Sequence, residues 1–197
     1  MLICITGQIG SGKTSLLNKF KSLGFKTFEM DKYIHEIYKK NKIGYQLIKK
    51  NFGDSYVNEI EVDRKKLGQL VFNDNKKLNK LNSLTIPLIR QKILELKNIN
   101  EHIFVELGIY LKYEKLFNDL FDHIILIKGE SEIETKKLQN LSWFNKKSDI
   151  FSPLEVHEEK GFIVLENNKD KKHIKNLAKK TINILGIKTK NPSKILM

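Results

Sequence analysis

One short segment constrains the fold of this 197-residue chain more than any other. Residues 7–14 read Gly-Gln-Ile-Gly-Ser-Gly-Lys-Thr and match the pattern G-x-x-x-x-G-K-[ST] at every fixed position. An apolar run at Leu2–Thr6 precedes the segment, and Ser15–Phe20 continues it with an amphipathic helical pattern. Glycines let the backbone turn tightly and bring N–H groups against phosphate oxygens, and a helix N-terminus adds partial positive charge. The sequence therefore predicts a strand, a phosphate-binding loop and a helix in succession.

This loop predicts a site for ATP and Mg²⁺. We expect Lys13 to reach the β- and γ-phosphates, Thr14 to ligate Mg²⁺ through its hydroxyl, and Ser15 to donate toward the α-phosphate. The loop alone does not separate kinases, GTPases and ATPases. Residues 145–148 read Asn-Lys-Lys-Ser and lack the Asp of the guanine signature N-K-x-D, which argues against a common GTPase, and larger ATPases would need a longer chain. A small chain with this loop and with a helical insertion after the second predicted strand, described below, suggests a nucleoside or small-molecule kinase. The residues of this segment predicted to bind ATP are Gly7, Ile9, Gly10, Ser11, Gly12, Lys13, Thr14 and Ser15.

Strand-like apolar runs recur along the chain, and helical patterns separate them. Short buried strands that alternate with helices are typical of a parallel sheet covered on both faces. We therefore predict an α/β fold, a three-layer sandwich with a parallel sheet of the kind found in kinases with this loop. The predicted strands are Leu2–Thr6, Lys26–Met30, His102–Leu107, His123–Ile127 and Gly161–Leu165.

Two segments do not fit simple crossovers between strands. Residues 34–97 are about twice as long as such a crossover needs and carry apolar residues at helical spacing. We expect them to form a helical insertion that binds the phosphoryl acceptor. Residues 132–159 are polar and are expected to form a mobile lid. The nucleotide-binding core is then residues 1–33 and 98–186, with a flexible basic tail at 187–197.

Two carboxylates lie at the end of the second predicted strand. Asp31 follows that strand directly, where ligands bind in open α/β sheets, and is expected to orient or deprotonate an attacking hydroxyl. An alternative is that Asp31 caps a helix beginning near Lys32, and the two roles are compatible. Glu29, two residues earlier, is a second candidate for Mg²⁺ binding through water.

The amino-acid composition excludes only a few classes of function. The net charge of +13 fits an anionic partner without identifying it, and the Lys-rich runs are also typical of solvated helix faces. Cys4 is the single cysteine and lies in an apolar run, so we expect a buried, inert thiol. The histidines show no metal-ligand spacing. No apolar run approaches the roughly 20 residues of a membrane span, so we expect a cytoplasmic chain with no membrane partner.

Several stretches of the sequence match known patterns. The phosphate-binding loop is followed by a strand ending Glu-Met-Asp at 29–31, similar to the pattern Asp-x-Asp. Residues 62–72 are similar to a D-R-x-x-L-x-x-x-V-F stretch, residues 78–89 to an L-x-x-L-N…H-P-x-I stretch, and residues 164–168 to a V-I-x-N-x-G turn. Over roughly residues 3–127, and less densely to residue 168, the chain therefore resembles the dephospho-coenzyme A kinase family, in which that turn lies near the adenine.

The resemblance implies transfer of the ATP γ-phosphoryl group to the ribose 3′-hydroxyl of dephospho-CoA, which gives CoA and ADP. It implies that Asp31 and Lys13 act in catalysis, and that Asp31, Arg64 and Glu114 contact the acceptor. On the ATP side it implies Lys137 from the lid and Asn168 from the late turn. Arg64 has a simpler alternative, an ion pair with Asp63 or Glu61 on the surface.

Three departures from the family pattern affect the expected activity. Ile86 stands where the family has His before Pro, and residues 110–112 read Tyr-Leu-Lys instead of Pro-Leu-Leu. The lid pattern Q-x-x-R-L-x-x-R corresponds to residues 134–141 here, where Lys137 replaces one arginine and the other is missing. Lysine is a point charge and cannot hold phosphate with an arginine's bidentate fork, so we expect slower phosphoryl transfer.

Two other functions remain open on the sequence alone. One is a kinase for another acceptor, such as a nucleoside or nucleotide. The other is a nucleotide-binding protein without efficient kinase activity, which binds nucleic acid through its lysines, although we do not expect nucleic acid as the partner. The salt dependence of binding would identify a nucleic-acid-binding protein, because binding to a phosphate backbone weakens steeply as the salt concentration rises.

Overall fold

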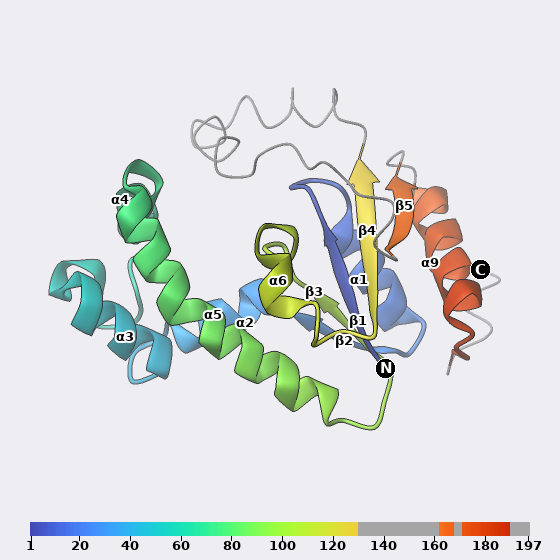
Figure 1. Cartoon of the computed structure of the whole chain (residues 1–197), viewed down its shortest axis with the longest axis horizontal. Coiled ribbons are helices and arrows are strands. Elements are labelled where there is room, and N and C mark those ends of the chain that lie inside the picture. Colours follow the sequence, from blue (N-terminus) through green and yellow to red (C-terminus); the bar gives the residue numbers. More distant parts are fainter. Residues whose placement is uncertain (130–161, 168–170, 190–197) are drawn as a thin grey trace. The chain divides into compact units, whose positions relative to one another are not determined.

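The computed structural model describes residues 1–129, 162–167 and 171–189. The predicted lid, with Lys137, and also Asn168 lie outside these residues. Five strands form, at the positions expected from the apolar runs and with ends that differ by one or two residues (Figure 1). They are β1 (Leu2–Gly7), β2 (Lys26–Glu29), β3 (Ile103–Glu106), β4 (His123–Gly129) and β5 (Ile163–Asn167).

Helices and short turns connect these strands. In the described residues the α-helices are α1 (Lys13–Ser22), α2 (Met30–Ile37), α3 (Ile43–Phe52), α4 (Arg64–Asn73), α5 (Asn75–Lys97), α6 (Glu114–Phe117) and α9 (Lys171–Leu185). Two 3₁₀ turns, η1 (Asp54–Tyr56) and η2 (Leu111–Tyr113), complete them. None of the described helices is both long enough and apolar enough to span a membrane.

The strands form one parallel sheet in the order β2-β3-β1-β4-β5. After β1 the chain crosses to the edge of the sheet at β2, returns to place β3 between β2 and β1, and then adds β4 and β5 on the other side of β1. Such a reversal of strand order beside β1 leaves a crevice at the carboxyl ends of the strands, where ligands bind in this class of sheet. The predicted parallel α/β architecture is therefore confirmed.

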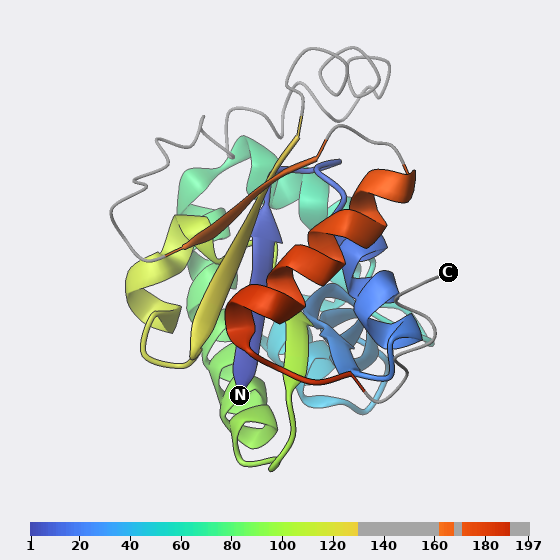
Figure 2. The ribbon, with the colours of Figure 1, turned by 90° about the vertical axis from the view of Figure 1, so that its right-hand side faces the viewer.

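Two helices cover one face of the sheet and fix the position of the phosphate-binding loop. Helices α1 and α9 lie side by side on this face, and α6 lies on the opposite side (Figure 2). From α1, the fully buried Phe20 stacks on Phe104 of β3 with ring centroids 3.7 Å apart, and Phe25 meets both rings edge-on. Because such buried aromatic contacts hold α1 firmly on the sheet, its N-terminus is fixed beside the end of β1.

The packing of this core contradicts the expected start of the flexible tail and agrees with the expected burial of Cys4. Ile187, expected to begin a flexible tail, packs into this core with 7% of its surface exposed. Thr189 donates a hydrogen bond of 2.5 Å to the carbonyl of Leu23. The beginning of the predicted tail is thus part of the packed fold. Cys4 is fully buried, and burial raises the pKa of its thiol well above the ordinary value, which fits an inert core residue.

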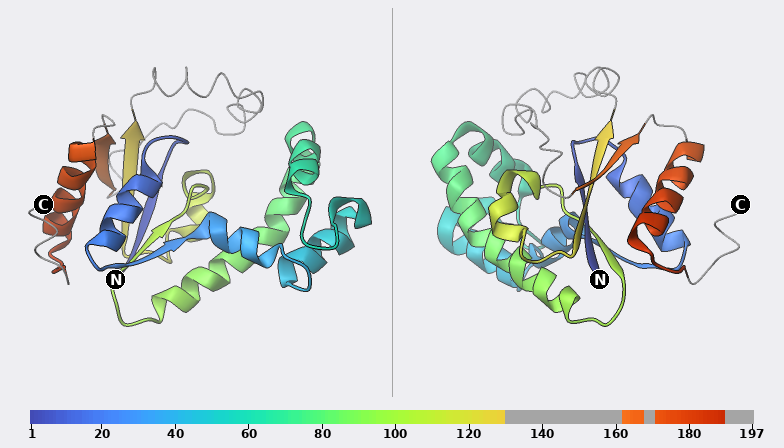
Figure 3. Two further views of the ribbon diagram at one scale, coloured as in Figure 1. Left: turned by 180° about the vertical axis from the view of Figure 1, so that it is seen from behind. Right: turned by 45° about the vertical axis from the view of Figure 1, so that its right-hand side comes forward.

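The chain divides into two compact units, residues 1–29 with 95–197 and residues 30–94. The first contains the whole sheet. The second is largely helical and contains α2, α3, α4 and most of α5, which are drawn in blue to green in Figure 3. We expected the insertion to begin at residue 34, but the second unit begins at Met30, the first residue of α2. Its own apolar core comprises Ile37, Tyr38, Tyr45, Ile48, Val62, Leu67 and Val71.

Candidate nucleotide-binding site

The loop between β1 and α1 requires glycine at both of its ends. Gly7, the last residue of β1, has φ +146°, and a Cβ atom there would lie 2.3 Å from the carbonyl oxygen of Ile127. Gly12, directly before α1, has φ +98°, and a Cβ atom there would lie 2.3 Å from Nδ2 of Asn167. Side chains rarely adopt this backbone conformation, and nothing larger than hydrogen fits. The glycines of the motif therefore serve the tight turn that the sequence predicts.

Asn167 holds the loop to the edge of the sheet. It is the last residue of β5, it is 5% exposed, and its Nδ2 donates a 2.8 Å hydrogen bond to the carbonyl of Ser11. Sequence reasoning chose the neighbouring Asn168 for this region and missed Asn167. The signal was present, because Asn167 is the residue that matches the asparagine of the V-I-x-N-x-G pattern.

Ser11 has its polar groups turned inward in this structure. Its N–H donates to the carbonyl of Gln8 at 3.2 Å, and its side chain is fully buried. Within the described residues, its hydroxyl and that of Thr6 are buried without a hydrogen-bond partner. Such unpaired buried hydroxyls are uncommon in folded proteins. The contact of Ser11 with ATP stays a prediction.

Thr14 and Glu106 meet at the carboxyl edge of the sheet. The Thr14 hydroxyl lies 3.0 Å from each carboxylate oxygen of Glu106, the last residue of β3, and donates to it. Glu29, the last residue of β2, is the register partner of Glu106, so the two carboxylates stand on the same face of neighbouring strands. Sequence reasoning proposed Thr14 and Glu29 but missed Glu106, although a carboxylate at a strand end is the same signal that singled out Glu29.

Oxygen donors of this kind fit Mg²⁺. Hydroxyl and carboxylate oxygens are the ligands that Mg²⁺ prefers, and in kinase sites it keeps several waters and is completed by phosphate oxygens. A site with few protein ligands is therefore expected. Among the described residues, no cluster of three or more His, Cys, Asp or Glu side chains forms.

Lys13 lies over the loop. Its ammonium group donates to the carbonyls of Gly7 at 3.1 Å and Gln8 at 2.7 Å. These contacts hold a positive charge beside the backbone turn where the phosphates are expected. The predicted contact of Lys13 with the β- and γ-phosphates would replace these carbonyl oxygens with phosphate oxygens, which are stronger partners for an ammonium group because they are charged.

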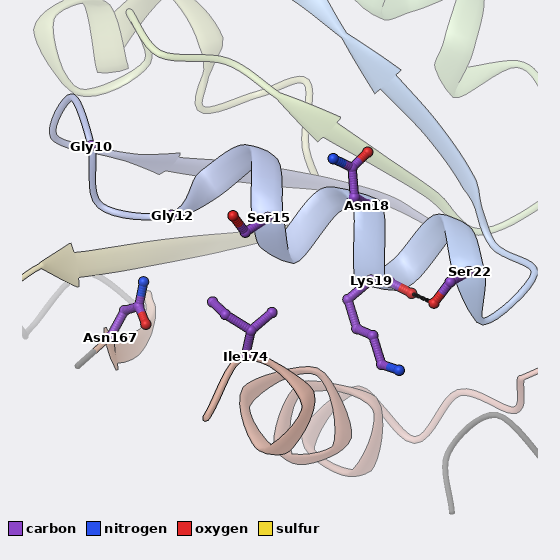
Figure 4. Close-up of a pocket in the computed structure, with 8 residues that line it drawn as sticks. All are labelled: Gly10, Gly12, Ser15, Asn18, Lys19, Ser22, Asn167 and Ile174. Carbon is purple, nitrogen blue, oxygen red and sulfur yellow. Dashed lines mark hydrogen bonds between the residues drawn. The ribbon is translucent and has the colours of Figure 1, made fainter. Parts of the chain in front are cut away.

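A groove of about 480 Å³ runs from the loop along α1. Figure 4 shows it between α1 and α9, with Ile174 facing it from α9 and Asn167 at the end nearest the loop. Of the residues predicted to bind ATP, Gly10, Gly12 and Ser15 line it. The sequence did not indicate the other lining residues, which are Asn18, Lys19, Ser22, Asn167 and Ile174.

In the second unit, the structure corrects the local setting of Asp31. Helix α2 begins at Met30, so Asp31 lies in the first turn of that helix rather than directly after the strand. The helix expected near Lys32 therefore begins two residues earlier, and Asp31 is not its cap. A carboxylate in the first turn is still favourable, because it lies near the partial positive charge of the helix N-terminus.

Arg64 contacts a histidine rather than an acid. Its Nη1 lies 2.6 Å from Nε2 of His35, while the carboxylate of Asp63 accepts a 2.9 Å hydrogen bond from the backbone N–H of Lys66 and caps α4. The expected alternative, an ion pair of Arg64 with Asp63 or Glu61, is thus replaced by the contact with His35. Glu114, the third predicted acceptor residue, belongs to the first unit and begins α6.

The family model and the most similar relatives indicate one family. The family model described as dephospho-CoA kinase matches residues 1–148. The dephospho-CoA kinase of Mycoplasma genitalium is 40% identical over 153 residues, which cover 76% of this chain and 77% of that protein. That of Mycoplasma pneumoniae is 35% identical and covers 71% of each chain. The structure of dephospho-CoA kinase from Campylobacter jejuni superposes with a TM-score of 0.66 at 27% identity, covering 93% of this chain and 96% of that one. The chain belongs to the dephospho-CoA kinase family.

Proposed function

We propose that this chain is a cytoplasmic enzyme that transfers the γ-phosphoryl group of ATP to the ribose 3′-hydroxyl of dephospho-CoA, giving CoA and ADP. The observation that carries the proposal is the contact of Thr14 with Glu106 at the mouth of the phosphate-binding loop. This contact places a hydroxyl and a carboxylate beside the start of α1, at the edge of the sheet where kinases of this fold hold the triphosphate.

On the ATP side, the chain provides charge and backbone donors. The loop N–H groups and the start of α1 are expected to bind the phosphates, and Lys13 to neutralise charge on the transferring group. Thr14 and Glu106, with Glu29 beside them, are the residues that would hold Mg²⁺. When bound, the ion supplies further neutralisation of the phosphate charge. Lys137 and Asn168 are proposed as further ATP contacts from the family resemblance.

On the acceptor side, Asp31 is proposed to orient the 3′-hydroxyl and to accept its proton as the new O–P bond forms. Arg64 and Glu114 are proposed to contact the rest of the acceptor. A carboxylate suits this role because it can hold a hydroxyl within hydrogen-bond reach of the reacting phosphorus and take up the proton during transfer.

An assay of ADP release tests the choice of acceptor. The purified chain is supplied with ATP and Mg²⁺ and then with dephospho-CoA or with each member of a nucleoside panel. We expect dephospho-CoA to stimulate ADP release and the nucleosides to leave it near the rate of ATP hydrolysis alone. Stimulation by a nucleoside and not by dephospho-CoA would overturn the proposed substrate.

A second arm tests Asp31. We expect Asp31→Asn to lower kcat by at least about 100-fold while ATP affinity stays within about twofold, because the amide cannot accept the proton. Glu36→Gln on the same helix α2 is the control, since Glu36 is exposed and pairs with Lys39. Equal turnover in Asp31→Asn and the unaltered chain would remove Asp31 from the mechanism.

A further inference from the structure

One contact in the second unit joins two helices through exposed side chains. His35 lies on α2, Arg64 is the first residue of α4, and their nitrogens are 2.6 Å apart. Both side chains are exposed. Exposed polar contacts add little to folding stability, because water replaces either partner at small cost. The contact is therefore of interest for where it places the guanidinium group rather than for holding the unit together.

The backbone of Arg64 is fixed independently of His35. The N–H of Val62 donates to the carbonyl of Tyr38 at 2.9 Å, and the N–H of Asp63 donates to the carbonyl of Tyr56 at 2.9 Å. The side chain of Asp63 then caps α4. These bonds fix the main chain at the start of α4, but the long side chain of Arg64 keeps its own torsional freedom. His35 holds the far end of that side chain.

The contact requires a neutral imidazole. Arginine stays protonated and only donates, so Nε2 of His35 must accept, and a protonated ring has no acceptor nitrogen. The pKa of His35 lies below its ordinary value of 6.5, first because of partial burial and then because of the charge of Arg64. The carboxylates that oppose this shift are Asp31, one turn earlier on α2, and Glu61, from the segment before α4. Near neutral pH, His35 is therefore neutral and able to accept.

We propose that His35 is a positioning residue that holds the guanidinium group of Arg64 ready for a phosphate group of the acceptor. The contact engages one N–H of the guanidinium fork, and the other N–H groups of the fork match phosphate oxygens in pairs. Holding the side chain before the acceptor arrives reduces the freedom lost on binding. The inference rests on the proposed function, because it takes dephospho-CoA as the acceptor and Arg64 as one of its contacts.

Steady-state kinetics near pH 7.5 test the inference. We expect His35→Ala to raise KM for dephospho-CoA about fivefold and to leave kcat and KM for ATP within about twofold, since one hydrogen bond to a charged group is lost. His35→Gln keeps an acceptor and should stay within about twofold of the unaltered chain throughout. His102→Ala is the matched control, because His102 is a half-buried histidine of the other unit whose pKa is also lowered, by partial burial and the N-terminal amino group.

A double-mutant cycle shows whether His35 acts through Arg64. If it does, adding His35→Ala to Arg64→Ala changes KM no further, because the group that His35 positions is already gone. Full additivity of the two substitutions would overturn the inference. So would a His35→Ala chain whose melting temperature falls while its KM for dephospho-CoA stays unchanged.

The pH profile gives a readout that a merely structural role would not move. As pH falls through the lowered pKa of His35, which lies below the ordinary histidine value, the ring gains a proton, loses its acceptor nitrogen and repels Arg64, so KM for dephospho-CoA should rise. His35→Gln should lack this part of the rise, and identical profiles for the two chains would contradict the inference.

By NMR, Arg64→Ala should raise the pKa of His35, and an unchanged pKa would also contradict the inference. If the unaltered chain does not phosphorylate dephospho-CoA, the proposed function itself has failed; normal turnover with an unaffected His35→Ala defeats only this inference.

Discussion

At the residue scale, Gly12 is required for two separable reasons. Its φ of +98° strains any side chain, and a Cβ atom would meet Nδ2 of Asn167 at 2.3 Å. We expect Gly12→Ala to lower the free energy of unfolding by about 2 kcal/mol or more and to weaken ATP binding. Urea unfolding and calorimetry measure the two effects.

Gly186 supplies the control for this substitution. It has φ +61°, but nothing lies within 4 Å of where its Cβ would be. Gly186→Ala should therefore show the backbone strain alone, about 1 kcal/mol, with ATP binding unchanged. Equal losses of stability in the two variants would show that the contact with Asn167 does not matter.

Glu106 carries the next prediction at this scale. Glu106→Gln keeps an oxygen that can accept from Thr14 but removes the negative charge. We expect kcat to fall about 100-fold and the Mg²⁺ concentration needed for half-maximal rate to rise, with the fold intact. Glu101→Gln is the control, since Glu101 pairs with Lys26 on the surface. A Glu106→Gln chain with normal rate and normal Mg²⁺ dependence would remove this carboxylate from the site.

Some residues of the candidate site could be predicted from the sequence, and others could not. Gly7–Thr14 could be recognised because each position has a strict local requirement that sequence spacing records. Glu106 and Asn167 could not be placed with the same ease, because they reach the loop from strands that lie far away in sequence. Their proximity depends on the order of strands in the sheet, and apolar patterns do not encode that order.

At the scale of elements, the packing of α1 determines where the loop lies. Phe20 is fully buried and stacks on Phe104. We expect Phe20→Ala to lower the free energy of unfolding by about 3–5 kcal/mol, because a large cavity replaces the ring. ATP binding should weaken as well, since α1 loses its fixed position. Ile184→Ala on α9, where the side chain is 54% exposed, should change the free energy of unfolding by less than about 0.5 kcal/mol.

A small loss of stability in Phe20→Ala, similar to that of Ile184→Ala, would contradict this account of the core. Guanidinium unfolding followed by circular dichroism measures both variants under the same conditions.

The ends of elements were the least predictable feature. All five strands were predicted from apolar runs, yet Met30 was assigned to the second strand and in fact begins α2. Met30 is buried, as it would be in either element. Apolar patterns report burial, whereas an element's end is set by the change in backbone hydrogen bonding, so ends one or two residues away are the expected error.

At the scale of the whole molecule, a net charge of +13 should itself reduce stability. Like charges repel one another more strongly in the compact chain than in the unfolded one. We expect the melting temperature to rise as sodium chloride increases from about 0.02 M to about 0.15 M, because the salt screens this repulsion. Scanning calorimetry measures it, with equal osmolality of glycerol as the control for non-ionic effects. A melting temperature that falls over this range would show that attractive pairs dominate instead.

The most direct test of the central claim identifies the product. The chain is incubated with ATP, Mg²⁺ and dephospho-CoA, and the product is examined by phosphorus NMR and mass spectrometry, with Lys13→Ala as the inactive control. The account predicts a new monoester phosphate on the ribose 3′-oxygen, formed in equal amount with ADP, and a product that migrates with CoA. ADP and inorganic phosphate without a phosphorylated acceptor, or a phosphate at another oxygen, would contradict it.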